Sequence, residues 1–490
     1  MRTLLRLPAR HGVLLAAYAV LVFLGVRHHE PWFDEAQSWL LARDLGLSDL
    51  LFHQLRYEGT PGLWVMLLSI PTKAHLPYGS LGLIGGICAV AGMSVFLRYS
   101  PFPEPVKLLL PLSYFAAYQY AVVARSYALI PLFAFLAAYF YRQAKYETYQ
   151  FAAALGLLAN VSAHGTAIAV GFALAYAWEV LGVWSAFDAD TRRRHVLAAA
   201  IFGLIIVAVV AMAWPPSDAN FYAVYRQTTL ALATDTTYTA IAGAFLGSRP
   251  ISLAIFLLLA AWCSLRGRSA VFIVPVGLLL ALYIRVWAQP WHLGILLFTA
   301  VSSLWVTWPT AEERRQFNKL SQTGYWIVTG VLAATFCFQF VWTAKTYAYD
   351  WSHAFSGSRD AAEYLKSVGA DRSRLVAFGF STTAVLPYFQ SNIYTNEALL
   401  DRASFWHWSK ANDATQNPQA LLALVPDYAI IGWKTDQEEA LYDQFLRKFG
   451  YTLVRESVGG MYFKYEVQQP DSYRIYKRNS MNIAPTFVEK

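Results

Sequence analysis

Long apolar segments recur along the chain from the N-terminus to about residue 345, each about 15–22 residues long. The hydrocarbon core of a bilayer takes about 20 helical residues, or somewhat fewer where the bilayer thins. Alternating period-2 strands, as in a barrel, are absent from the sequence. The pattern therefore predicts an α-helical polytopic membrane protein with about eleven transmembrane helices. The expected spans are residues 11–27, 78–97, 107–124, 127–141, 150–164, 166–184, 196–214, 240–265, 270–288, 292–308 and 325–345.

One short apolar segment, residues 61–76, decides which side every later loop faces. It contains Pro71 and Lys73, and we interpret it as an interfacial or re-entrant piece rather than a span. Under this interpretation the loops on one side contain Arg98, Lys107, Arg142, Lys145, Arg192, Arg193, Arg194, Arg266, Arg268, Arg314, Arg315 and Lys319. Because basic loops stay in the cytoplasm, the N-terminus is predicted to be cytoplasmic. The C-terminus and the loops 28–60 and 215–239 are then extracytoplasmic.

The two ends of the membrane region need separate treatment. The first apolar segment follows Arg2, Arg6 and Arg10 and could pass for a signal peptide. We interpret it as a retained span, because no clear small-x-small cleavage site follows it and many spans come after. In the first outer loop, residues 34–45 and 48–57 are amphipathic and are expected to form interfacial helices.

The chain changes character after residue 345: it becomes polar, mixed in charge and free of spanning segments. Helices are predicted at residues 358–369, 382–390 and 436–450, and strands at residues 374–380, 428–433, 451–456 and 461–467. Such alternation favours a small layered α/β domain. The expected organisation is a transmembrane domain at 1–345 and an extracytoplasmic α/β domain at 346–490.

The composition agrees with a membrane protein and excludes other classes. Hydrophobic residues make up 57% of the chain and charged residues 14%, whereas a soluble globular chain carries nearer a quarter charged. The net charge of +8 comes from short clusters between apolar segments, which are topology signals and do not indicate nucleic acid binding. Cys88, Cys263 and Cys337 lie inside separate apolar segments and give no disulfide or zinc pattern.

An acidic pair, Asp34 and Glu35, lies among aromatic residues just after the first span. Carboxylates beside a bilayer are costly and tend to be functional, so this loop is the candidate active site. Asp34 could instead cap the helix that follows it, which does not exclude catalysis. Glu35 could instead be a first-turn helix charge.

The predicted topology gathers further polar residues on the same outer face, namely Arg125, Tyr127, His164, Arg285 and His292. Each has a structural alternative: the arginines could anchor the membrane interface, Tyr127 could simply pack, and the histidines could hydrogen-bond between helices or at helix ends. As a group, these residues could carry out a reaction. A carboxylate can accept a proton from a hydroxyl, and arginine and histidine side chains can hold phosphate oxygens and stabilise developing charge. These residues predict an outer-face site for an anionic, lipid-like substrate.

The acidic loop and two later elements resemble motifs of the GT-C membrane glycosyltransferases. This superfamily contains protein O-mannosyltransferases, lipid A aminoarabinose transferases and RgtA/B/C/D-like bacterial glycosyltransferases. The matching elements are Trp32-Phe33-Asp34-Glu35-Ala36, Glu58-Gly59-Thr60-Pro61-Gly62-Leu63-Trp64 and Ala124-Arg125-Ser126-Tyr127-Ala128-Leu129. His164 also stands where relatives often carry a histidine after the fifth span. The resemblance covers residues 1–345 and, loosely, a C-terminal outer domain.

This resemblance implies an inverting glycosyltransferase that moves a sugar from a polyprenyl-phosphate donor to a hydroxyl of a lipid, polysaccharide or protein. Asp34 matches the family's loop aspartate, the general base. The polyprenyl phosphate would leave into a basic pocket built from some of Arg125, His164, Arg285 and His292. The turn after Arg125 lacks the second acidic residue of many relatives, and Gly62 replaces the second proline of the family element. The missing acid weakens the case for a divalent metal, so we commit to no cofactor and leave a divalent metal open.

Two other functions stay open. A transporter or flippase for a lipid-linked sugar would place polar sites near the midplane on broken helices, whereas here they gather at outer helix ends. An O-antigen ligase- or polymerase-like enzyme would use a diphosphate-linked donor. The expected location in each case is the inner or plasma membrane of a cell; the sequence names neither the sugar nor the acceptor.

Overall fold

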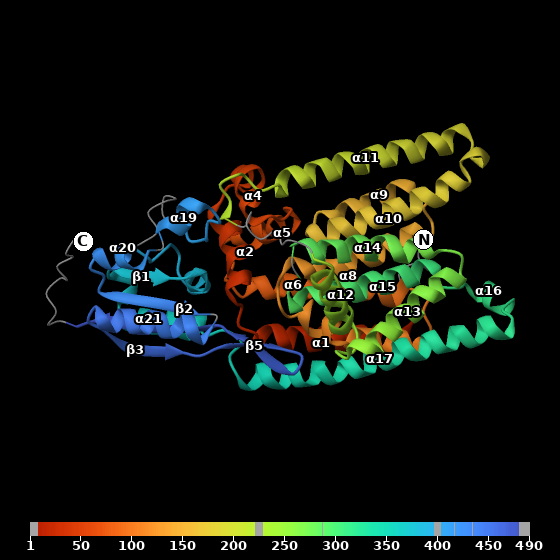
Figure 1. The fold of residues 1–490 in the computed structure, drawn as a ribbon. Coiled ribbons are helices and arrows are strands. Elements are labelled where there is room, and N and C mark those ends of the chain that lie inside the picture. Colours follow the sequence, from red (N-terminus) through yellow and green to blue (C-terminus); the bar gives the residue numbers. More distant parts are fainter. Residues whose placement is uncertain are drawn as a thin grey trace.

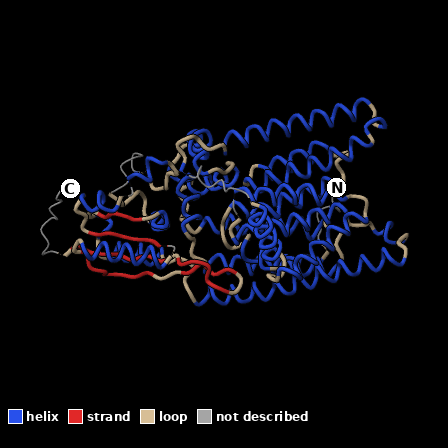
Figure 2. The backbone as a smooth tube through the Cα atoms, in the orientation of Figure 1, coloured by secondary structure: helices blue, strands red, loops and turns tan. Residues whose placement is uncertain are grey.

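The computed structural model is a helical bundle with an α/β domain at one end (Figure 1). It describes residues 8–220, 229–286, 288–395, 403–415, 417–433 and 435–479. The strands gather in the C-terminal part (Figure 2), and helix α1 begins at the end of the bundle that is remote from them (Figure 1). We call the two ends of the bundle the domain end and the remote end.

Eleven helices form the body of the bundle among the described residues: α1 (Ala9–His28), α6 (Ser80–Tyr99), α8 (Leu129–Tyr141), α9 (Thr148–Ala159), α10 (Ala163–Gly182), α11 (Ala189–Ala213), α12 (Leu230–Ala244), α13 (Arg249–Leu265), α14 (Ser269–Val286), α15 (Leu293–Thr307) and α17 (Lys319–Ser352). By length and composition, seven helices of the described chain can cross a membrane, or eight if α12 and α13 form one bent span. The protein is therefore a multi-pass membrane protein. The predicted count of about eleven spans is larger than the seven or eight helices of the described chain that are long and apolar enough to cross a membrane.

The predicted span at residues 107–124 is not a continuous helix. In its place stand α7 (Glu104–Leu109), a 3₁₀ turn at Leu110–Leu112 and a π turn at Phe115–Gln119. Pro111 lies within the 3₁₀ turn, and it cannot donate a backbone hydrogen bond. Nearly all of residues 110–124 are buried by other helices, and irregular backbone is tolerated at membrane depth where protein covers it. An apolar segment was thus mistaken for a lipid-facing helix because the protein interior is equally apolar.

The predicted span at residues 240–265 is also wrong in its bounds. Helix α12 begins ten residues earlier, within the predicted outer loop, and meets α13 at an angle of 83°. Gly247 lies in the break with φ of +81°, a conformation that favours glycine. The Gln339 side chain donates to the carbonyls of Ala244 and Phe245 at 3.0 and 2.9 Å, and so satisfies groups that the end of α12 leaves free.

The first loop, at the domain end, carries α2 (Phe33–Asp44), α3 (Leu47–Asp49), α4 (Leu55–Glu58) and α5 (Leu63–Lys73). These match the two predicted amphipathic stretches and the short apolar segment. Helix α5 has 11 residues, about 17 Å of helix, and the hydrocarbon core is about 30 Å thick. Its length alone is insufficient to cross.

Several of the predicted cytoplasmic clusters meet at the remote end, around the C-terminus of α15. Arg142 donates to the carbonyls of Trp305 and Trp308 at 3.0 and 2.9 Å. Arg266 and Arg268 donate to carbonyls of the same helix end. Arg266 also forms an ion pair with Glu313 of α16 (Ala311–Arg315). Cations at a helix C-terminus are favourable, so these residues stabilise the bundle in addition to any topological role.

The C-terminal domain is an α/β layer built on a four-stranded sheet in the order β1-β2-β6-β3. Its strands are β1 (Leu375–Phe378), β2 (Tyr428–Trp433), β3 (Tyr451–Ser457) and β6 (Ser472–Arg478), with helices α18 (Ser358–Ser367), α19 (Lys410–Thr415), α20 (Pro418–Ala423) and α21 (Asp436–Lys448). β1 and β2 are parallel, and β6 runs antiparallel to both of its neighbours. The predicted helix at residues 382–390 is a 3₁₀ segment at Phe380–Tyr388.

The predicted strand at residues 461–467 is split into a hairpin, β4 (Gly460–Phe463) and β5 (Glu466–Pro470), and the central strand β6 was not predicted. The chain turns at Lys464, which has φ of +64°. Lys464 is buried in the bundle, where its ammonium group donates to the Gly243 carbonyl at 2.5 Å and lies 4.3 Å from the Trp342 ring. The hairpin tip thus joins the domain to the end of α12.

Candidate functional site

The first turn of α2 places the acidic pair. Trp32 is the N-cap residue, and the backbone N–H of Trp32 donates to the Glu35 carboxylate at 3.2 Å. This is one half of a capping box, with Glu35 at the third helical position. Asp34 is therefore not the N-cap; it lies in the first turn, where the helix dipole favours a negative charge.

The Glu35 carboxylate is enclosed and fully engaged. Its side chain is 0% exposed. Besides Trp32, the Ala124 backbone N–H donates to its Oε1 at 2.6 Å and His29 Nε2 donates to its Oε2 at 3.0 Å. Glu35 thus ties the start of α2 to the end of α1 and to the residue that precedes Arg125.

His29 carries a positive charge in this network. Burial alone would lower the pKa of His29, but Glu35 and Asp350 raise it to about 10. Asp350, near the end of α17, lies 3.6 Å from His29 Nδ1 and accepts a hydrogen bond from Tyr118 at 2.9 Å. The network therefore connects α1, α2 and α17 through one imidazolium and two carboxylates.

Asp34 is paired with Arg125 at the edge of this buried network. Their side chains are 25% and 20% exposed, so the pair remains open to ligands. Burial alone would lower the pKa of Arg125, but the neighbouring Asp34 raises it, and the guanidinium stays charged. The guanidinium also lies 5.5 Å from the Trp32 ring and 5.6 Å from the Tyr127 ring, at cation–π distance.

Tyr127 connects Arg125 to two histidines. The Tyr127 hydroxyl lies 2.9 Å from His292 Nε2, and the backbone N–H of Gln289 donates to His292 Nδ1 at 3.2 Å. Because Nδ1 accepts, the ring is neutral and its proton lies on Nε2, which donates to the tyrosine oxygen. The hydroxyl proton of Tyr127 is then directed away from His292.

His164 completes the cluster from the start of α10. Ser162 caps that helix by accepting from the Gly165 N–H at 3.2 Å, which holds His164 in the first turn. His164 is 8% exposed as a residue, and its ring centroid lies 4.6 Å from that of His292. Its Nδ1 is buried with no hydrogen-bond partner among the described residues. Buried polar atoms normally have partners, so this nitrogen marks a place where a ligand or water can bind.

Arg285 is placed differently from the other predicted residues. It is exposed near the end of α14, whereas Tyr283, two residues earlier, is buried and packs 5.5 Å from His164. Residues two apart on a helix point about 200° apart. Arg285 therefore points to a different side of α14 from Tyr283, and none of the contacts between described residues that join Asp34, Arg125, Tyr127, His292 and His164 involves it.

A second carboxylate, Glu58 at the end of α4, lies near Asp34 on the side of the C-terminal domain. It accepts from Gln37 and Gln54 at 2.9 and 3.3 Å. Gln37 also exchanges two hydrogen bonds with the Trp406 backbone, at 2.7 and 2.8 Å. Burial raises the pKa of Glu58, and the hydrogen bonds from Gln37 and Gln54 act in the opposite direction. The net result is a pKa of about 7. Gln37 thus links Glu58 directly to the backbone of the C-terminal domain.

Replacing Glu58 by glutamine should remove a pH dependence of stability. The folded pKa is above the unfolded value of 4.5, so the contribution is complete below pH 4.5 and is lost as the pH rises through about 7. The thermal midpoint of the wild type in detergent should fall between pH 5 and pH 8 by an amount that Glu58→Gln lacks. Glu312→Gln, an exposed change in α16, is the control and should keep the wild-type slope. An unchanged slope in Glu58→Gln would contradict the assignment.

The described residues contain no group of three or more histidine, cysteine, aspartate or glutamate side chains arranged to hold a metal ion. Asp34 is engaged by Arg125 and Glu35 by three donors. Among the described residues, therefore, neither carboxylate of the acidic pair is part of a metal-binding group.

A cavity of about 580 Å³ is lined on one side by Glu35 and His29. Helices α1 and α6 form its apolar floor, and Arg359 and Tyr388 of the C-terminal domain form part of its polar wall. Glu35 and His29 line this space, whereas Asp34 and Arg125 are not among its lining residues.

The bundle, the domain at one end and the charged cluster between them define a membrane protein with one candidate site at the domain junction. No family model and no curated protein sequence matches the chain. The structure, however, is similar to the crystal structure of ArnT from Cupriavidus metallidurans bound to undecaprenyl phosphate, with a TM-score of 0.54 and 11% identity over 96% of this chain and 98% of that chain. At this identity the likeness shows the fold alone: the chain folds like ArnT over nearly its whole length.

Several residues of the site were not predicted. His29 is inside the acidic loop, but its ion pair with Glu35 depends on a turn that the sequence does not reveal. Asp350 is a carboxylate at the end of an apolar helix. A charge in such a position is energetically costly and tends to be functional, so the sequence alone could have identified Asp350 as a candidate site residue. Gln37 and Glu58 gave no separate signal, because their role depends on the position of the C-terminal domain.

Proposed function

We propose that the protein is an inverting glycosyltransferase that moves a sugar from a polyprenyl-phosphate donor to an acceptor hydroxyl. The observation that carries the proposal is the partly open Asp34–Arg125 pair, with the hydroxyl of Tyr127 and the imidazoles of His292 and His164 beside it. A base, a fixed cation and neutral hydrogen-bond donors suit the transfer of a sugar away from a phosphate. Undecaprenyl phosphate bound to ArnT, a protein of the same fold, supports the choice of leaving group.

In the proposed reaction Asp34 accepts the proton of the acceptor hydroxyl. The acceptor oxygen attacks the anomeric carbon, and the bond from that carbon to the phosphate oxygen breaks with its electron pair, so polyprenyl phosphate leaves. Attack from the side opposite the phosphate inverts the anomeric centre. Arg125 holds the phosphate as its charge increases, and the Tyr127 proton, directed away from His292, donates to a phosphate oxygen.

Donor binding and base activation are coupled in this arrangement. The guanidinium of Arg125 is held by Asp34 when no donor is bound. A donor phosphate competes for the same guanidinium, and Asp34 is then free to accept a proton. The Glu35 side chain is 0% exposed and accepts a hydrogen bond from the Ala124 N–H, so we assign it the role of positioning the backbone before Arg125. This separates the two acidic residues into a base and a positioning residue.

Tyr127→Phe should weaken the interaction with the donor phosphate without removing the base. Hydrogen bonds to charged groups contribute about 1.5–3 kcal/mol, so kcat/KM should fall about 10- to 100-fold. The assay is transfer of a labelled sugar by protein reconstituted in liposomes. Tyr120→Phe is a matched control, because its hydroxyl donates to the Trp291 carbonyl at 2.8 Å and is not available to a ligand. Equal loss in both variants would contradict the assigned role.

We further propose that the site is extracytoplasmic, in an inner or plasma membrane, with the N-terminus in the cytoplasm. The convergence of basic residues at the remote end supports this orientation. The acceptor is a hydroxyl of a lipid, polysaccharide or protein. A cysteine accessibility assay in intact cells, with single cysteines at exposed positions Arg315 and Lys366, tests the orientation: only Lys366→Cys should react with an impermeant reagent.

The donor class decides between this function and its rivals. The reconstituted protein should transfer sugar from a polyprenyl-monophosphate donor and release free polyprenyl phosphate. Transfer only from a diphosphate-linked donor would indicate a ligase- or polymerase-like enzyme. Movement of the lipid-linked sugar across the liposome bilayer without a covalent product would indicate a flippase.

A further inference from the structure

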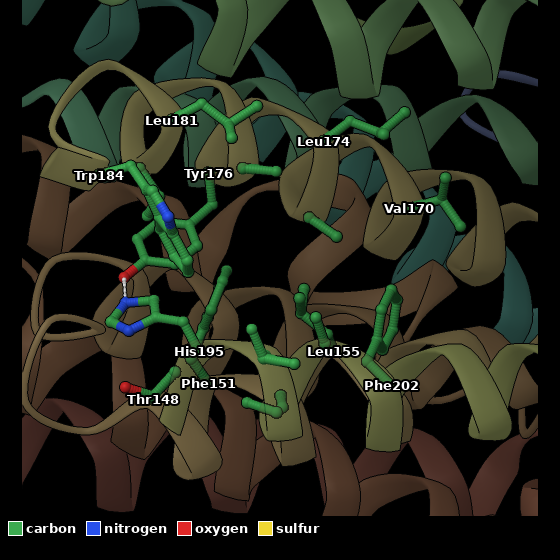
Figure 3. A pocket seen from close by; sticks show the side chains of 17 residues that line it. Thr148, Phe151, Leu155, Val170, Leu174, Tyr176, Leu181, Trp184, His195 and Phe202 are labelled. Carbon is green, nitrogen blue, oxygen red and sulfur yellow. Dashed lines mark hydrogen bonds between the residues drawn. The ribbon is translucent and has the colours of Figure 1, made fainter. Parts of the chain in front are cut away.

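A separate cavity of about 410 Å³ lies between α9, α10 and α11 (Figure 3). Five alanines make room for it, while leucine, phenylalanine and valine side chains form most of the remaining wall. These alanines are Ala152, Ala173, Ala177, Ala198 and Ala199. The volume is too small for a whole phospholipid and suits part of one hydrocarbon chain.

The polar side chains of the wall gather at one end and are hydrogen-bonded there. His195 Nδ1 donates to the Thr191 carbonyl at 2.8 Å, and its Nε2 accepts from the Tyr176 hydroxyl at 2.9 Å (Figure 3). Thr148 donates to the Ala144 carbonyl at 2.8 Å. These groups have no need of a polar ligand, so the cavity suits a hydrocarbon chain.

The cavity opens sideways to the bilayer. Helix α11 lies along the edge of the bundle (Figure 1), and only four of its 25 residues are buried. Leu174, Leu181 and Val196 line the cavity and are also largely exposed on the lipid-facing surface. A chain from the surrounding leaflet can therefore enter between α11 and its neighbours.

Basic residues stand at the polar end. The Arg192 guanidinium lies 5.9 Å from the Trp184 ring and donates to the carbonyls of Trp184 and Ser185. Arg193, next in sequence, is exposed. Tryptophan and arginine at a helix end are typical of the headgroup region, where arginines attract anionic lipids.

We propose that this cavity binds an anionic phospholipid from the leaflet at the remote end. One hydrocarbon chain lies between α11 and the α9–α10 pair, and the phosphate lies against Arg192 and Arg193. The site is distinct from the proposed sugar-transfer site: Gly182, the last residue of α10 and two positions before Trp184, is about 27 Å along that helix from His164. The inference does not depend on the proposed function, because it follows from the cavity and its charged end.

Native mass spectrometry of the purified full chain tests the proposal. Titration with phosphatidylglycerol and with phosphatidylcholine of the same chains should give a preference of about tenfold or more for the anionic lipid. Ala173→Phe fills the cavity and should abolish the high-affinity binding, and Arg192→Gln/Arg193→Gln should bring the two lipids to near-equal affinity. Ala211→Phe, on the exposed surface of α11, and Arg315→Gln, at α16, should leave binding unchanged.

Equal binding of the two lipids by the wild type would overturn the proposal. So would displacement of the phospholipid by polyprenyl phosphate, which would assign the cavity to the donor chain. If Ala173→Phe does not fold, a second measurement is available: the quenching of tryptophan fluorescence by phosphatidylglycerol with brominated chains. The wild type should be quenched more than Trp184→Phe, and equal quenching would contradict a chain in this cavity.

Discussion

Replacing Asp34 by asparagine is expected to lower the rate of sugar transfer about 10²- to 10⁴-fold, the range for the loss of a general base. Asparagine keeps the shape of the side chain and can still accept a hydrogen bond from Arg125, but it cannot take up the acceptor proton. The measurement is kcat for transfer of a labelled sugar in liposomes, with donor at saturation. Donor binding should change far less than kcat.

Asp49→Asn is the matched control for this result. It is the same substitution in the same outer loop, on a side chain that is 70% exposed in α3. It should retain full activity. An Asp34→Asn protein that folds and transfers sugar at the rate of Asp49→Asn would remove the proposed base.

Replacing Glu35 by glutamine is expected to cause the largest loss of stability, about 3–5 kcal/mol, because it breaks a buried ion pair. The amide of glutamine would direct N–H groups at donors that now point to Glu35, the Trp32 backbone and His29. Unfolding by denaturant in mixed micelles measures the change. Glu30→Gln is the control: its pair with the half-exposed Arg359 should contribute less than about 1 kcal/mol.

The stability difference between the wild type and Glu35→Gln should depend on pH in a defined direction. The pKa of His29 is about 10 in the folded protein, above the unfolded value of 6.5. The stabilisation is therefore complete below pH 6.5 and disappears as the pH rises through about 10. The gap between wild type and Glu35→Gln should narrow over that range. In a double-mutant cycle with His29→Gln, the two losses should be less than additive; strict additivity would show that the two residues do not interact.

The parts of the fold that the sequence predicted are those where one local pattern decides. Long apolar segments flanked by basic residues became helices such as α1, α6 and α11, and β2 began and ended at the predicted residues. The failures at residues 107–124 and 240–265 arise because an apolar interior and a bilayer select the same residues. The hairpin at Lys464 was missed because its turn is stabilised by the bundle, not by local turn residues.

The candidate site follows the same division. Motif resemblance and predicted sidedness identified Asp34, Arg125, Tyr127, His164 and His292, and the fold places them in one connected cluster. Sidedness alone could not separate Arg285 from them, because it does not report which way a helix faces. The distinct environments of Asp34 and Glu35 also required the structure, since adjacent helical residues point about 100° apart.

The stereochemistry of the product tests the central claim most directly. Nuclear magnetic resonance can determine the anomeric configuration of the transferred sugar and of the polyprenyl-phosphate donor in the same reconstituted reaction. A single displacement with Asp34 as base predicts that the product linkage has the opposite configuration to the donor. Retention of the donor configuration would contradict it, because two successive displacements would then be needed and Asp34 could not act only as a base.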